Sequence, residues 1–321
     1  MRKSGLIALG LGVVALAVTP RATLAETFLV DLTHPLPTFQ AMEGDPMKPD
    51  LANPWLDSKP IPTFGQQTVL SLGEFPIPAG TFDLGTLVLS EHHGTHMDTS
   101  AHFVNKPETL ESGNPPASER ELAHMTDADD LIGKVVLIDI SGRVQSELDK
   151  NGGKPSPDPA VTDFRNDSGN VVTADDVAAV ADQIDDGVWV VLNNGWSRFY
   201  FEGTDWGKDP YINSWNFPGL SHAGVDKLIE IENQKGVRIN GVVADLIGVE
   251  SGESSKGSDD QWSDSWPAHV RGMQRGWKLV ENAANLGALS QASGGCTLVV
   301  GAPKHVRGTG GPSRVLALCE R

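Results

Sequence analysis

One short stretch of the chain, from His92 to His102, concentrates potential metal ligands around a single glycine. Four of the nine histidines lie in it, together with Asp98. Imidazole and carboxylate groups are the ligands that first-row divalent metals take at neutral pH. Core packing does not explain such a cluster, so the stretch predicts a metal site built from His92, His96 and Asp98, with His102 beside it.

The spacing of these residues restricts the local backbone. On a straight strand His92 and His96 would lie roughly 13 Å apart, at about 3.3 Å per residue, too far to share one ion. On a helix those two would be neighbours, but Asp98 would point elsewhere at about 100° per residue. The ligands therefore require a strand that ends in a tight turn, and Gly94 permits the unusual backbone angles of that turn. The β-forming run Thr86–Ser90 supplies the strand.

A second candidate pair, His269 and Glu281, lies far downstream. On one straight helix the two would be about 18 Å apart at 1.5 Å per residue. A break at Gly276 would allow a short helix from near Pro267, then an extended segment, with Glu281 starting a new turn. Taken alone, such a pair is more often solvent-exposed than metal-binding.

The first 25 residues have the pattern of a secretory signal peptide. Arg2 and Lys3 are followed by the apolar run Leu6–Val18, and cleavage is expected after about Ala25. The alternative is an uncleaved anchor, although the run is short for a membrane span and no other stretch approaches that length. We therefore predict an exported protein, periplasmic or secreted, with residues 26–321 as one domain.

The net charge of the chain argues against some classes of binding partner. The formal net charge is −17, and signal cleavage would remove only positive charges. An acidic surface argues against nucleic acid and anionic membranes as partners and says little about the substrate.

The order of elements predicts an α/β fold with more strands than helices. Strands are expected over 28–36, 68–75, 82–90, 133–141, 188–192 and 237–245 and in a C-terminal pair, helices over 173–187 and 221–234, and loops elsewhere, including 251–264. Thr173 and Asp176 form a capping box, and Ser221 and Gly236 mark the start and end of the second helix.

The string HHGTHMDTSAHF, from His92 to Phe103, resembles the signature H-x-G-T-H-x-D-x-P-x-H-F of the cyclase family, which includes bacterial kynurenine formamidases and isatin hydrolases. Ser100 stands where the family usually has proline. The likeness spans most of residues 28–319, and its further landmarks follow in order: DLTHPL, EGDP, the strand 188–196 ending in Gly-Trp, FPGLS, Asp245 and GTGGPSRVLAL.

The resemblance implies a single-domain mixed β-sheet, barrel-like core with flanking helices, of the swivelling β/β/α type, and a homo-oligomer. It implies that His92, His96 and Asp98 are metal ligands and that His102 is the catalytic acid–base.

In two-metal members of the family a downstream His and Glu complete the site. This implies His269 and Glu281 here, with Asp98 able to bridge. The expected cofactor is therefore one or two divalent ions, Zn²⁺ or Mn²⁺, per chain.

These groups predict a metal-dependent hydrolase. A bound ion would lower the pKa of its water towards about 7, and His102 would carry a proton to the leaving atom. The expected substrate is a small amide, formamide, cyclic imide or lactone, with attack on a C–N bond other than a peptide bond favoured. Trp55, Phe103 and Trp196 are candidate walls for an aromatic substrate, or core residues. The alternative is a non-catalytic periplasmic metal- or ligand-binding protein, which would not need His102.

The two cysteines, Cys296 and Cys319, flank the predicted C-terminal strand pair. If its turn lies between Arg307 and Gly308, the cysteines face each other, within reach of a disulfide. A one-residue shift in register would instead leave two free thiols. We predict the bond, as a structural and not a catalytic feature.

Overall fold

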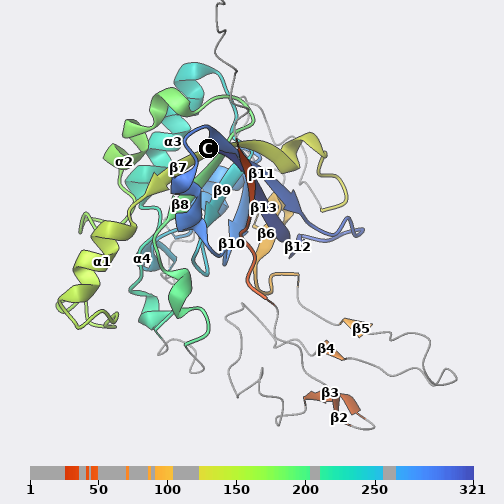
Figure 1. The fold of residues 1–321 in the computed structure, drawn as a ribbon, viewed down its shortest axis with the longest axis horizontal. Coiled ribbons are helices and arrows are strands. Elements are labelled where there is room, and N and C mark those ends of the chain that lie inside the picture. Colours follow the sequence, from red (N-terminus) through yellow and green to blue (C-terminus); the bar gives the residue numbers. More distant parts are fainter. Residues whose placement is uncertain are drawn as a thin grey trace, which may run out of the picture.

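The described residues form a curled, nine-stranded mixed sheet with helices gathered on one side (Figure 1). In this computed structural model they are 26–35, 91–103, 123–202, 210–255 and 265–321, with the backbone of four further short strands. The strand order is β1-β13-β11-β7-β8-β9-β10-β6-β12. The nine strands are β1 (Thr27–Asp31), β6 (His96–Asp98), β7 (Ile132–Asp139), β8 (Trp189–Asn193), β9 (Gly241–Ala244), β10 (Lys278–Glu281), β11 (Gly295–Gly301), β12 (Gly310–Pro312) and β13 (Arg314–Glu320).

The centre of the sheet is parallel, from β7 through β8 and β9 to β10. Its strands are near-continuous apolar runs because both faces are covered. In β8, Val190 and Leu192 join the core beneath the helices, whereas Trp189 and Val191 join a second core on the concave side. This alternation gives the sheet two hydrophobic cores within one domain.

The predicted helix signals hold, although one helix is shorter than expected. Ser221 accepts a hydrogen bond from the Gly224 N–H at the start of α3, and Gly236, with φ of 67°, ends it. Thr173 and Asp176 form the predicted capping box of α2, but this helix ends at Ala179 instead of near Gly187. A 3-10 turn continues the chain. The helices are α1 (Ser141–Asp149), α2 (Ala174–Ala179), α3 (His222–Lys235) and α4 (Gly252–Ser255).

Two helices were not predicted. The α1 helix starts where the Asp139 carboxylate accepts hydrogen bonds from the Ser141 backbone and hydroxyl, and it buries Val144 and Leu148, four residues apart. The short α4 helix begins a stretch predicted to be a loop, and the strand predicted over 237–245 is reduced to β9. Among the described helices, none is long and apolar enough to cross a membrane.

The remaining elements are short, and four of them form two separate two-stranded sheets, β2-β3 and β4-β5. The predictions for residues 1–25, for the loop to Phe64, for Trp55 and for most of 105–130 lie outside the described residues, as does most of the predicted strands 68–75 and 82–90. The short elements are β2 (Ala41–Met42), β3 (Asp45–Pro49), β4 (Leu70–Ser71), β5 (Thr86–Leu87), 3-10 helices at Ser100–His102, Asp129–Leu131, Ala181–Gln183, Ser197–Phe199, Asn213–Trp215 and Leu286–Gln291, and a π-helix at Ala268–Gly272.

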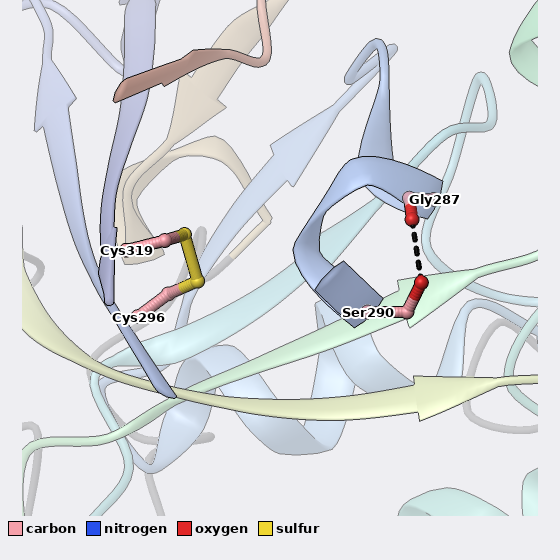
Figure 2. The surroundings of a disulfide bond; sticks show 4 residues. All are labelled: Gly287, Ser290, Cys296 and Cys319. Carbon is pink, nitrogen blue, oxygen red and sulfur yellow. Dashed lines mark hydrogen bonds between the residues drawn. A yellow bond between two sulfur atoms is a disulfide. The ribbon is translucent and has the colours of Figure 1, made fainter. Parts of the chain in front are cut away.

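The antiparallel end of the sheet carries the predicted disulfide. Cys296 of β11 pairs directly with Cys319 of β13, and their sulfur atoms are bonded. Figure 2 shows the bond beside the turn in which Ser290 donates a hydrogen bond to Gly287. The register is the predicted one, but β12 lies between the two strands in sequence, so their connection is not the simple turn that we expected.

Candidate metal centre

The first ligand group is built around the turn at Gly94 and strand β6. Gly94 has φ of 64°, as the predicted tight turn requires. His96 and Asp98 lie two residues apart on β6, so their side chains point to the same face of the strand, whereas His92 lies before the turn. The sequence interpretation placed the strand before the ligands. The structure places two of them on a strand after the turn, because β6 is held between β10 and β12.

The second group approaches from the parallel side of the same sheet. Gly276, with φ of 89°, separates the π-helix that carries His269 from strand β10. Glu281 is the last residue of β10, whereas the sequence analysis predicted that it would start a new turn. Its position directly opposite His96 in the antiparallel β10–β6 pair brings Glu281 Oε2 within 3.5 Å of His96 Nε2.

Asp98 lies where the two groups meet. Its potential ligand atom lies within 4.8 Å of those of His92 and His96, and a second set of the same size joins Asp98 to His102 and His269. His269 Nε2 is 3.7 Å from Asp98 Oδ2 and 3.1 Å from Glu281 Oε1. The fold thus brings together all six residues singled out in the sequence.

His102 occupies a position that suits either a proton carrier or a ligand. It ends the 3-10 helix Ser100–His102, and its ring stacks on that of His92 with centroids 3.8 Å apart. Burial lowers its pKa to about 4, although Asp98 opposes this shift. A neutral imidazole is the form that accepts a proton.

Two buried carboxylates dominate the electrostatics of the site. Burial opposes the ionised form of Asp98, but His92, His96 and His102 outweigh it and hold the Asp98 pKa well below its usual value. Burial, followed by repulsion from Asp98, raises the pKa of Glu281. Burial also opposes the charged form of His96, yet Asp98 and Glu281 raise its pKa. The carboxylates and imidazoles therefore stabilise one another's charges within an enclosed site.

The buried oxygens fit a cation. Among the described residues, Asp98 Oδ2 and Glu281 Oε1 are buried and receive no well-aligned hydrogen bond, although His269 Nε2 lies 3.7 and 3.1 Å from them. Buried polar atoms are rarely left in this way, because the loss of solvation is costly. A divalent ion held by imidazole nitrogens and carboxylate oxygens would satisfy both.

Two of the candidate ligand histidines are held by groups that the sequence interpretation missed. His96 Nδ1 is 2.9 Å from the Gly94 carbonyl, to which Asn282 also donates a hydrogen bond. His269 Nδ1 lies 2.9 Å from Glu250 Oε1, and this oxygen also accepts the Ala268 and His269 N–H groups. These contacts leave Nε2 of both rings for a metal. Glu250 lies after β9, outside the histidine-rich signature and the downstream pair, so no sequence motif indicates it.

Aromatic rings border the inner side of the site. The Phe103 ring lies 4.6 Å from that of His269, and Trp266 lies 5.2 Å from it. Trp196, the other candidate wall that is described, is instead packed in the core, with its Nε1–H donated to the Tyr211 carbonyl. Trp266 was missed because nothing in its local sequence distinguishes it from a core residue.

The fold of the chain, a curled mixed sheet with helices on one side, is similar to that of several solved structures. An isatin hydrolase bound to the product analogue thioisatinate is 24% identical, with a TM-score of 0.61 over 92% of this chain and 94% of that chain. Isatin hydrolase A from Labrenzia aggregata, bound to benzyl benzoate, is 21% identical, with a TM-score of 0.59 over 92% and 94%. The enzyme of the same name from Ralstonia solanacearum is 20% identical, with a TM-score of 0.58 over 92% of each chain.

The family follows from the sequence match. The family described as "Putative cyclase" matches residues 30–251, more than half of the chain. No curated protein matches the sequence of this chain. The chain belongs to the cyclase family, and its fold is the one that the family predicts.

Proposed function

We propose that the protein is a metal-dependent hydrolase that opens a small amide or cyclic amide, with formamides, imides and lactones as related substrates. The observation that carries the proposal is the pair of buried carboxylate oxygens, Asp98 Oδ2 and Glu281 Oε1, which receive no well-aligned hydrogen bond. They lie among the imidazoles of His92, His96, His102 and His269. Such a donor set suits Zn²⁺ or Mn²⁺ and leaves the number of ions, one or two, to be measured.

The family and its neighbours support the choice of reaction. The structural neighbours are named isatin hydrolases, and isatin is a small aromatic cyclic amide. Phe103 and Trp266 give this chain apolar surface beside the donors, on which a flat ring can pack. We therefore favour a C–N bond in an aromatic cyclic amide or formamide over a lactone.

The residues around the donors have defined tasks in this reaction. A divalent ion supplies a more acidic water and a polarised carbonyl when it is bound. His92, His96, Asp98, His269 and Glu281 would hold it. His102, neutral because of its burial, accepts a proton as the water oxygen bonds to the carbonyl carbon. It returns that proton to the nitrogen as the C–N bond breaks, so one water is consumed and no covalent nucleophile is needed.

Metal analysis and activity measured on the same samples test this proposal. The purified protein should contain a divalent metal and hydrolyse at least one member of a panel of isatin, N-formyl anilines, cyclic imides and lactones. Chelation should abolish the activity, and Zn²⁺ or Mn²⁺ should restore it. Full activity in metal-free protein would contradict the proposal.

The His102→Ala variant separates metal binding from chemistry. It should keep the metal and lose about 100-fold or more in rate, the usual size of general acid–base catalysis. His96→Ala should lose both. If His102→Ala loses metal to the same extent as His96→Ala, His102 is a ligand and the acid–base must be sought elsewhere.

We also propose that the chain is exported and cleaved after about Ala25, and that it forms a homo-oligomer. The Cys296–Cys319 disulfide supports an oxidising compartment. Mass spectrometry of protein from the periplasm should give a chain that begins at Glu26, and light scattering gives the oligomeric state. A full-length chain retained in the membrane would contradict export.

A further inference from the structure

His92 is held differently from the other two ligand histidines. His96 and His269 turn Nδ1 toward Gly94 and Glu250 and present Nε2 to the site. In His92 the arrangement is reversed. Its Nδ1 lies 2.5 Å from Asp98 Oδ1, and its Nε2 lies 2.9 Å from the hydroxyl of Thr309.

The Thr309 hydroxyl has one proton and two neighbours. Its oxygen is 2.6 Å from Glu91 Oε2, which also accepts the Thr309 N–H at 2.9 Å. Because an ionised carboxylate only accepts hydrogen bonds, the hydroxyl donates its proton to Glu91. The hydroxyl oxygen is then an acceptor toward His92, so the ring carries a proton on Nε2. Nδ1 faces the Asp98 carboxylate and would exchange its own proton for a metal ion there.

A second partner keeps Glu91 in the accepting role. His305 Nε2 lies 2.8 Å from Glu91 Oε1, and its Nδ1 faces the Pro303 carbonyl at 3.1 Å. Both ring nitrogens of His305 therefore face acceptors, which favours the cationic ring beside an ionised carboxylate. Glu91 thus receives hydrogen bonds at both oxygens.

The backbone around Thr309 is built to hold this contact. The Thr309 carbonyl accepts from both the N–H and the hydroxyl of Thr99, at 3.0 and 2.9 Å. The next residue, Gly310, pairs with Asp98 across the β12–β6 ladder. A Cβ at Gly310 would lie 2.7 Å from Cε1 of His92, so only glycine lets the ring lie against β12. These contacts give the terminal GTGG segment a task that the resemblance alone does not define.

We propose that Thr309, fixed by Glu91, is the positioning residue that makes His92 a ligand through Nδ1, whereas His96 and His269 bind through Nε2. The inference rests on the proposed metal centre. Outer partners of this kind set the tautomer and orientation of a ligand imidazole, and their loss typically costs about 10–100-fold in metal affinity.

Zinc titration and histidine NMR on the whole protein test the proposal together. In ¹⁵N-histidine-labelled, zinc-loaded protein, long-range ¹H–¹⁵N spectra should show one ring with protonated Nε2 and metal-bound Nδ1. Thr309→Val should lower zinc affinity by about 10–100-fold and expose that Nε2 proton to exchange with water. Thr309→Ser should restore both properties, because it keeps the hydroxyl.

Thr162→Val is the matched control. It also removes a buried hydroxyl that donates to a backbone carbonyl, but that carbonyl belongs to Ser156, and within the described residues neither Thr162 nor Ser156 is hydrogen-bonded to Thr309 or to a candidate ligand ring. It should bind zinc as the wild type does. If Thr309→Val does not fold, Glu91→Gln serves instead, because an amide can donate to Thr309 and release the hydroxyl proton toward His92. Its zinc affinity should also fall.

The outcomes separate this inference from the function on which it rests. Wild-type zinc affinity in Thr309→Val, or a ring of His92 bound through Nε2, would overturn the positioning role and leave the metal centre intact. A wild-type protein that binds no zinc and no manganese would overturn both.

Discussion

The two ends of the donor set use the same kind of chemistry in opposite surroundings. At the inner end, the His269 side chain is 3% exposed and is held by Glu250, which is fully buried. At the outer end, the His92 side chain is 12% exposed and is held through Thr309 by Glu91 and His305, which are 35% and 39% exposed. A carboxylate orients the ring in both cases, directly in one and through a hydroxyl in the other. The inner contact should therefore be the stronger and the outer one the easier to alter.

The largest effect should come from the residue shared by both ends. Asp98→Asn removes the charge between the two sets of donors, so metal should be lost at both. We expect affinity to fall by more than the roughly 100-fold upper range for an outer partner. Isothermal titration with Zn²⁺ measures this. If one ion still binds with unchanged affinity, the two ends are independent sites and Asp98 does not link them.

Removal of the inner partner should affect both binding and folding. Glu250→Gln keeps the size of the side chain but removes the charge that faces His269, and we expect zinc affinity to fall by about 10–100-fold. The apoprotein should also lose stability, because the buried His269 loses its charged partner. The control is Glu253→Gln, an exposed carboxylate that accepts the Asn166 N–H. Equal zinc affinity and equal stability in Glu250→Gln and Glu253→Gln would mean that the buried contact of Glu250 with His269 does not contribute to metal binding.

The sequence predicts the ligands better than it predicts their partners. The spacing around Gly94 fixes a turn, and the family signature adds His269 and Glu281 at a distance. Trp266 is close to His269 in sequence, but nothing in its local sequence distinguishes it from a core residue. Glu250 and Thr309 also have no such signal, because they reach the candidate ligands only through contacts between segments distant in sequence. The same limit explains the errors in the strand before His92 and in α1, since the neighbours of β6 and the contacts of α1 are tertiary.

Removal of the disulfide tests whether metal binding at the two ends of the donor set depends on local contacts or on the overall stability of the protein. The bond closes a loop with a sequence separation of 23, so its loss should cost about 3 kcal/mol of unfolding free energy. The Cys296→Ala/Cys319→Ala variant should nevertheless bind zinc as the wild type does, because the bond joins β11 and β13, away from β6 and β10. Urea unfolding and zinc titration give the two values. A parallel fall in affinity would show that the site responds to global stability. Two reactive thiols in unreduced protein from the periplasm would rule the bond out.

Another buried histidine, His34, shows what happens without a carboxylate partner. His34 stacks on Tyr200 with ring centroids 4.0 Å apart, and burial lowers its pKa to about 4. Between pH 6.5 and 4 the unfolded chain binds a proton at this residue that the native protein does not, so its contribution is complete above pH 6.5 and is lost on acidification. From pH 7 to 5 the apoprotein should lose about 2 kcal/mol for this reason. His34→Phe keeps a ring against Tyr200 and should remove that part of the pH dependence. Urea unfolding of both proteins in chelator at the two pH values measures the difference. An equal loss in both proteins would mean that His34 is protonated in the native state.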